Sequence, residues 1–86
     1  MSKLFHAEYK AGSFIAEDIA GAVESFFCEH QKDFEDLETE YAASGGNDIV
    51  RLTVADGDEQ FARNAFKDAH NHGRHDTVRP CKFEVR

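Results

Sequence analysis

Residues 44–54 read Ser-Gly-Gly-Asn-Asp-Ile-Val-Arg-Leu-Thr-Val, and this stretch decides the fold. Its first five residues favour a tight turn, because Gly, Asn and Asp tolerate the backbone conformations that turns require. The six residues that follow alternate in polarity, with Val50, Leu52 and Val54 on the apolar side. The stretch therefore predicts a turn that leads directly into a strand with those three side chains facing inward.

The residues before the turn also alternate, which predicts a second strand over residues 37–44. Leu37, Thr39 and Tyr41 fall on one side and Glu38 and Glu40 on the other. The spacing of Leu37 and Tyr41 also fits a helix, so a first helix that continues to residue 43 is the competing interpretation. We favour the strand because the turn signal and the next strand follow immediately.

Two segments have the apolar spacing of amphipathic helices. The first runs from Glu17 to His30, where the macrodipole favours the acidic first turn. The second opens at Asp56, which is expected to cap it with Glu59 in a capping box, and Gly73 is expected to end it. The residues expected on the buried stripes are Ile19, Val23, Phe26, Phe27 and His30 in the first helix and Phe61, Ala62, Ala65, Phe66 and Ala69 in the second.

Strands are also expected near both ends of the sequence. Residues 3–9 alternate, with Phe5, Ala7 and Tyr9 on the core face. Residues 13–16 either return as a short second strand or already enter the first helix, and we favour the strand because Glu17 and Asp18 suit the first turn of a helix. The last strand covers residues 77–85 and is interrupted at Pro80, which places it at a sheet edge or at a bulge. The predicted order is ββαββαβ: one α+β domain over residues 1–86, with a mostly antiparallel sheet of four to five strands and two helices on one face.

Length and composition are those of a small globular domain, with 86 residues of which 41% are hydrophobic. The sequence contains neither an apolar run long enough to span a membrane nor the apolar region of a signal peptide, so we expect a cytoplasmic protein. Its two cysteines, Cys28 and Cys81, are expected to be reduced and buried.

Negative charge is concentrated in one part of the chain. Residues 17–48 carry ten carboxylates against the single base Lys32, a local charge of −9, whereas the whole chain has −7 and residues 63–86 have +3. This field repels phosphates and anionic lipids, so we expect neither direct nucleic-acid binding nor membrane binding, and a basic protein surface is the natural partner. The residues predicted to bind it are Glu29, Asp33, Glu35, Asp36, Glu38 and Glu40.

A histidine-rich segment is the best chemical alternative. His70, His72 and His75, with Cys81 further on, offer ligand types that zinc prefers. The spacing matches no established zinc motif, and histidine near a helix C-terminus also complements the helix dipole. We therefore predict no metal and no cofactor, and keep these four residues as weak candidates. The acidic pairs Glu38/Glu40 and Asp56/Asp58 are read as solvated, and we expect no enzymatic activity.

In size, charge and expected architecture the chain resembles small acidic inhibitor proteins encoded by phages, such as anti-CRISPR proteins and DNA mimics. Residues 15–23 look like the strand-into-helix entry of many small phage proteins. Residues 78–81, Val-Arg-Pro-Cys, are similar to the end of a short phage inhibitor of bacterial RNA polymerase. The resemblance includes no diagnostic motif, and it implies no functional position.

The leading hypothesis is therefore a non-enzymatic protein-binding module, an inhibitor whose acidic face blocks a basic surface of a nucleic-acid-handling complex. The alternatives are a small metal-binding domain and a structural or assembly subunit. We expect the chain to be a monomer or a homodimer. If the chain self-associates, we expect the contact to involve either the strand around Pro80 or an apolar sheet face opposite the helices.

Overall fold

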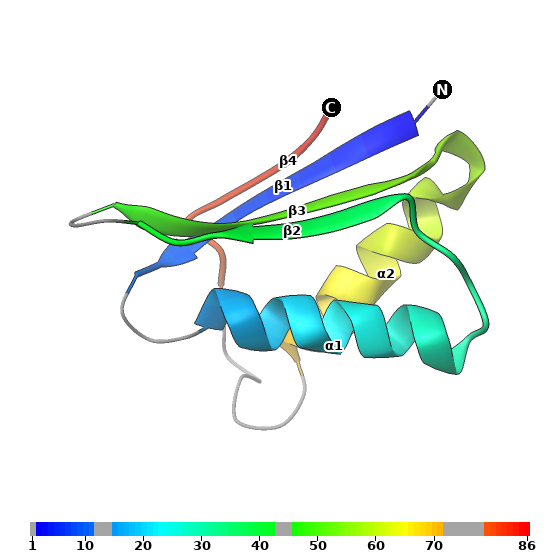
Figure 1. The fold of residues 1–86 in the computed structure, drawn as a ribbon, viewed down its shortest axis with the longest axis horizontal. Coiled ribbons are helices and arrows are strands. Elements are labelled where there is room, and N and C mark those ends of the chain that lie inside the picture. Colours follow the sequence, from blue (N-terminus) through cyan, green and yellow to red (C-terminus); the bar gives the residue numbers. More distant parts are fainter. Residues whose placement is uncertain (1, 12–14, 43–45, 72–78) are drawn as a thin grey trace.

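The computed structural model describes residues 2–11, 15–42, 46–71 and 79–86. Within these residues the fold has four strands, two α-helices and one short 3₁₀ turn (Figure 1). In chain order they are β1 (Ser2–Lys10), α1 (Ile15–Glu29), β2 (Asp36–Glu40), β3 (Asn47–Ala55), η1 (Asp56–Asp58), α2 (Glu59–His70) and β4 (Lys82–Val85).

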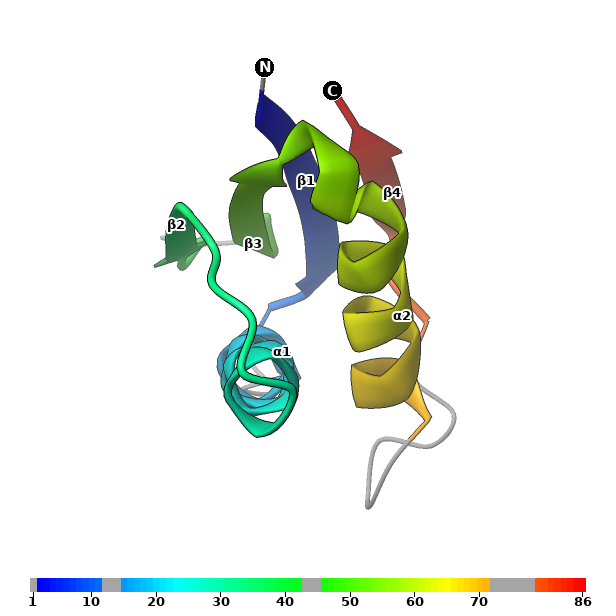
Figure 2. The ribbon, with the colours of Figure 1, turned by 90° about the vertical axis from the view of Figure 1, so that its right-hand side faces the viewer.

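The four strands form one sheet in the order β2-β3-β1-β4, and every neighbouring pair is antiparallel. Each helix connects two strands that a third strand separates, which is the split βαβ arrangement of ferredoxin-like topologies. Both helices lie on the same side of the sheet (Figures 1 and 2). The α+β class and the placement of the helices are thus confirmed.

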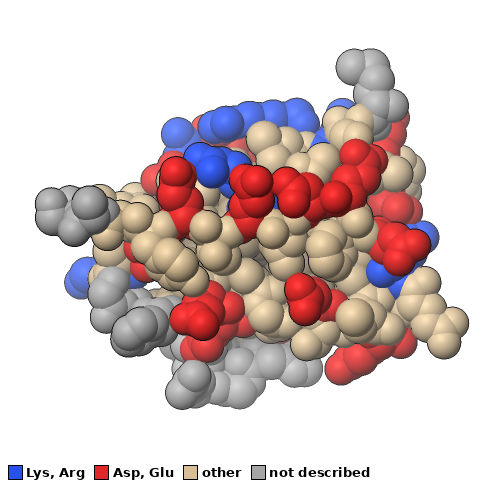
Figure 3. Space-filling model, in the orientation of Figure 1, with Lys and Arg blue, Asp and Glu red and all other residues tan. Residues whose placement is uncertain are grey.

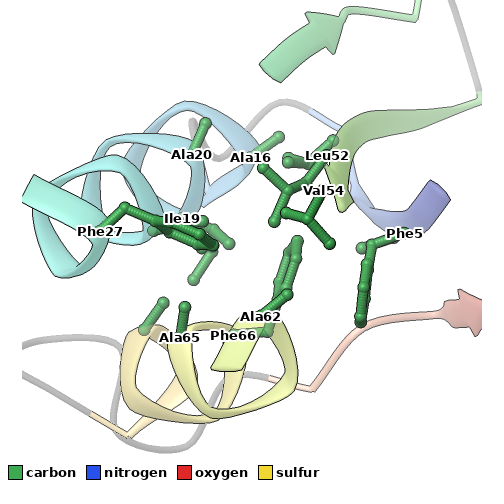
Figure 4. Packing of buried hydrophobic residues seen from close by; sticks show 14 of the residues in the cluster. Phe5, Ala16, Ile19, Ala20, Phe27, Leu52, Val54, Ala62, Ala65 and Phe66 are labelled. Atoms are coloured by element: carbon green, nitrogen blue, oxygen red, sulfur yellow. The ribbon is translucent and has the colours of Figure 1, made fainter. Parts of the chain in front are cut away.

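The core fills the space between the sheet and the two helices (Figure 4). The predicted inward residues of β1 and β3 are all buried, with Phe5, Val50 and Leu52 fully enclosed. The ring of Phe5 stacks on that of Phe66 from α2 at 5.8 Å between centroids. Burial of such aromatic and branched side chains contributes about 1.5–3 kcal/mol each, so this layer supplies most of the stability.

The expected second strand over residues 13–16 is wrong at its end, where Ile15 and Ala16 begin α1. Ala16 is fully buried and lies one helical turn before Ile19 and Ala20, so the buried helical stripe starts earlier than Glu17. At its other end the helix stops at Glu29, and His30 is exposed, contrary to expectation. The described order is therefore βαββαβ, and residues 12–14 lie outside the described part.

Two further expectations concern segment ends. Asp56 does not cap α2: it belongs to η1, no side-chain hydrogen bond caps α2, and its carboxylate lies 3.8 Å from the Lys3 ammonium. The last strand begins at Lys82, after Pro80, and forms one edge of the sheet, in agreement with the proline signal. The expected helix stop at Gly73 falls outside the described residues.

The sheet face opposite the helices is polar, so the expectation of an apolar face there is wrong. Strand register places Glu38, Arg51, His6 and Glu84 in one row across the four strands on this side. His6 is 5% exposed and its Nε2 lies 2.8 Å from Oε2 of Glu8. That contact lowers the pKa of the Glu8 carboxyl, with a smaller contribution from Asn47.

Both cysteines are free thiols, as expected, but both are exposed rather than buried. Cys28 follows the fully buried Phe27 on α1 and so points about 100° away from the core. Among the described helices, neither is long and apolar enough to cross a membrane.

The neighbours Phe27 and Cys28 test the orientation of α1. Replacing Phe27 with alanine removes a ring that contacts Phe34 and Phe61 at 5.5 and 4.9 Å between centroids. We expect Phe27→Ala to lower the free energy of unfolding by about 3–5 kcal/mol in urea denaturation. Cys28→Ala should change it by less than about 0.5 kcal/mol. Similar losses in both variants would contradict this orientation.

Candidate partner-binding surface

Three carboxylates stand in a row along the edge strand β2. Asp36, Glu38 and Glu40 alternate along it and share the side of the sheet away from the helices, opposite Thr53, Arg51 and Ile49 of β3. Their spacing along the strand is about 6.6–6.8 Å from one carboxylate-bearing residue to the next. Figure 3 shows carboxylates lined up where β2 crosses the view in Figure 1. We call Asp36, Glu38 and Glu40 the β2 acidic row.

The β2 acidic row is exposed and only lightly neutralised. Arg51 reaches Glu40 at 3.1 Å, and this is a solvent-exposed pair of the kind worth about 0–1 kcal/mol. No side-chain hydrogen bond or ion pair joins the carboxylate of Asp36 or Glu38 to another residue in the described part of the chain. Lys32, the one base of the acidic segment, turns to Asp58 at 3.1 Å and lies over the ring of Phe61. The strand row therefore keeps most of its negative charge.

The other three predicted binding residues do not belong to this row. Glu35 lies directly before β2, where its backbone N–H donates to Thr53 O at 2.8 Å and its side chain accepts from the Ser2 hydroxyl at 2.7 Å. Glu29 ends α1 in the helix layer, and Asp33 lies in the connection between α1 and β2. All three are exposed. The structure thus separates a strand row of three carboxylates from three that precede it in the chain, at the end of α1 and in the connection to β2.

Asp48, the last carboxylate of the acidic segment, has a structural role. It is 5% exposed, and its Oδ1 accepts a hydrogen bond of 3.0 Å from the backbone N–H of Ala42. This bond ties the end of β2 to the start of β3 across residues 43–45. The residue is therefore part of the hairpin and not of the exposed charge.

Sequence reasoning missed an aromatic residue beside the row. Tyr41 follows β2 directly and is 53% exposed, which makes it the exposed large apolar side chain of the described residues. Tyrosine combines a rigid apolar ring with a hydroxyl and is enriched at the centres of protein interfaces. Its position could have been noted from the sequence, but its exposure depends on where β2 ends.

Strand β2 also lies at the edge of the sheet. Because it is the outermost strand next to β3, one of its two sides has no strand neighbour among the described residues. Such an edge offers N–H and C=O groups to another chain, and charged side chains on it discourage unspecific pairing. The β2 acidic row therefore lies on an edge strand, with exposed Tyr41 directly after it in the chain.

The structure describes only part of the histidine-rich segment. His72 and His75 lie outside the described residues. His70 is half-buried, and its Nε2 lies 2.6 Å from the hydroxyl of Tyr9, so that nitrogen is already occupied. Cys81 is exposed, and its backbone N–H donates to Glu8 O. Among the described residues no group of three or more metal-ligating side chains comes together.

The contact between Tyr9 and His70 defines their protonation. Burial raises the pKa of Tyr9 well above its usual value, so the hydroxyl keeps its proton. The Tyr9 side chain is nearly inaccessible, and its buried proton needs an acceptor, which Nε2 of His70 supplies. Desolvation, with a smaller effect of Arg79, lowers the pKa of His70. His70 is thus a neutral imidazole that carries its proton on Nδ1.

This arrangement predicts a pH dependence of stability. Because the pKa of His70 is lower in the folded chain than the unfolded value of about 6.5, the unfolded chain binds a proton first as the pH falls. The contribution of His70 is present above about pH 6.5 and is lost as the pH falls towards the folded pKa. In urea denaturation at pH 7.5 to 5, wild type should lose more stability than His70→Gln. Parallel pH profiles would contradict the assignment.

Three comparisons give no relative from which a function could be transferred. No family model matches the chain, and neither a curated protein nor a solved structure matches it. Since one topology serves many unrelated activities, the function has to be inferred from the surface residues themselves.

Proposed function

We propose that this chain is a non-enzymatic protein-binding module that occupies a basic surface of another protein through the β2 acidic row. The observation that carries the proposal is the line of Asp36, Glu38 and Glu40 on an edge strand, next to exposed Tyr41. Carboxylates at every second residue of a strand have a spacing comparable to that of neighbouring phosphates along a nucleic-acid strand. A basic groove that receives phosphates is therefore a complementary partner.

Electrostatics supports an inhibitor more than a permanent subunit. A chain with a net charge of −7 is steered towards a basic groove from a distance, and the attraction weakens as salt shortens the Debye length to about 8 Å at 0.15 M. The β2 acidic row would compete directly with nucleic acid for the same basic side chains of the partner. Blocking of a nucleic-acid-handling protein in the cytoplasm is thus the action that this surface favours.

Charge-neutralised variants test the proposal. We expect Asp36→Asn/Glu38→Gln/Glu40→Gln to weaken partner capture by about 10–100-fold, because three lost contacts of about 0.5–1 kcal/mol each add up to 1.5–3 kcal/mol. The matched control is Glu17→Gln/Glu24→Gln/Asp56→Asn, which removes the same charge from exposed positions elsewhere. Capture from a nuclease-treated lysate of the source cells, quantified by mass spectrometry at 0.05 and 0.3 M salt, provides the measurement.

The outcomes separate recognition from a solubilising role. Loss of basic nucleic-acid-binding proteins in the row variant alone, with release of the wild-type partner by added DNA, supports the proposal. Equal capture by the row variant and the control contradicts it. A row variant that captures the same proteins but scatters more light would assign the carboxylates to protection of the edge against self-association.

A further inference from the structure

A pocket of about 370 Å³ opens between α2 and the segment that enters β4, away from the β2 acidic row. Its walls come from the last turns of α2 and from residues 79–83, which lie alongside that helix (Figure 2). The volume is at the lower end of the range for small-molecule sites, about 300–1,000 Å³. We call this feature the α2–β4 pocket.

The floor of the α2–β4 pocket is aromatic. Phe66 of α2 and Phe83 of β4 meet edge to face, with 5.2 Å between ring centroids. Phe66 is only 1% exposed and stacks on Phe5, so it backs the half-buried ring of Phe83, which is the ring a ligand can contact. Rigid aromatic surfaces of this kind favour a flat apolar ligand, because rings gain from edge and face contacts beyond simple burial.

The polar groups around this floor are mainly donors. Arg63, Lys67 and Arg79 line the pocket, and among the described residues that do so there is no carboxylate. Arg63 also forms an ion pair of 3.1 Å with Glu59, which does not line the pocket. In a chain of net charge −7, three bases around one hollow form a local exception. A neighbouring hollow is lined by both Lys67 and Asp68, so its charged residues have opposite signs.

The C-terminal end of α2, which would otherwise repel an anion in the pocket, has two of its free carbonyls covered. Helix C-termini carry a partial negative charge on their free carbonyls. Asn71 covers two of them: its Nδ2 donates to Lys67 O at 2.8 Å and its backbone N–H to Asp68 O at 3.1 Å. His70 lines the same end, and with Nε2 held by Tyr9 its remaining polar hydrogen is that on Nδ1. Donors thus outnumber acceptors around the pocket.

From the aromatic floor and the basic rim we infer that the α2–β4 pocket binds a small planar organic anion, a phosphate or carboxylate joined to an aromatic or heteroaromatic ring. The ring rests on Phe83, which the buried Phe66 supports, and the anionic group is held by Lys67 and Arg79. A nucleoside monophosphate is near the upper size that the volume admits. This site is independent of the proposed partner-binding surface, since it uses the opposite edge of the sheet.

Four probes separate the contributions of the ring and of the anion. AMP carries both, adenosine only the ring, ribose 5-phosphate only the phosphate, and 4-hydroxybenzoate a ring with a carboxylate. Each is titrated into ¹⁵N-labelled full-length protein at 0.15 M salt, with amide chemical shifts as the readout. We expect AMP or 4-hydroxybenzoate to bind with a dissociation constant below about 1 mM, and the other two at least about tenfold more weakly. Shifts should centre on residues 63–71 and 79–84.

Three variants of pocket residues and one control variant test the assignment. Lys67→Gln and Arg79→Gln should each weaken binding by about tenfold, because a charge-assisted hydrogen bond is lost. Lys3→Gln removes the same charge far from the pocket and should leave the affinity unchanged within about twofold. Phe83→Leu keeps apolar volume but removes a ring, so it should weaken the ring-bearing anions and not ribose 5-phosphate. Thermal melts of each variant confirm that it is folded.

Several results would overturn the inference. Absence of saturable binding by both ring-bearing anions up to about 5 mM, or shifts centred on other residues, rejects the site. If Lys67→Gln, Arg79→Gln and Lys3→Gln all lost the same affinity, binding would depend on the overall charge of the chain and not on the pocket. Ribose 5-phosphate as tight as AMP would contradict the role of the aromatic floor. Binding by only one of the two ring-bearing anions supports the site and identifies its anionic group.

Discussion

Strand β1 has to satisfy two neighbours and one buried layer at the same time, and the rest of the structure depends on this constraint. It pairs with β3 along its whole length on one side and with β4 on the other. Its inward residues Phe5, Ala7 and Tyr9 are all enclosed by the layer that contains both helices. Tyr9 also reaches α2 through His70. A strand so placed cannot shift by one residue, because a shift would turn the aromatic rings to the polar face.

The parts of the fold that could be predicted are those that local periodicity encodes. Alternation in β1 and β3 identified Phe5, Ala7, Val50 and Leu52 as core. Two strands follow the first helix as predicted, but the bounds were wrong: β2 ends at Glu40 and not at residue 44, and β3 already begins at Asn47, inside the expected turn. The error at Ala16 arose because its helical partners Ile19 and Ala20 lie within a window that also fits a short strand before the helix. The burial of both cysteines was also wrong, since composition gives no information about which side of a helix or loop a residue occupies.

The surfaces were predictable to a smaller extent. The acidic segment is visible as composition, but only the pairing of β2 with β3 shows that Asp36, Glu38 and Glu40 form one row and that Asp48 is buried. The α2–β4 pocket was not predicted at all. It joins residues 63–71 to residues 79–83, and neither segment alone contains its floor or its charge. Features that arise from the contact of two distant segments carry no local signal.

Charge is therefore sorted by sheet edge. The β2 edge carries the exposed carboxylates. At the other edge Lys82 of β4 and Arg86 directly after it outnumber Glu84, with which both form ion pairs, and this edge borders the basic pocket. Opposite charges at the two edges give the molecule a dipole across its strands, although its net charge is negative. Such a dipole orients the molecule before contact, so that the β2 edge approaches a positive surface first.

The pairing of β1 with β4 has a consequence for how this chain folds. Phe5 lies opposite Val85, 80 positions later, and Leu4 and Arg86 exchange backbone hydrogen bonds of 2.8 and 3.0 Å (termini in Figure 1). During synthesis β1 therefore emerges with one side lacking its neighbour until almost all of these residues have been made. Contacts of such long sequence separation slow folding, because a large loop must close before they form. The edge of β1 that β4 finally covers is the place where a nascent chain is most exposed to wrong pairing.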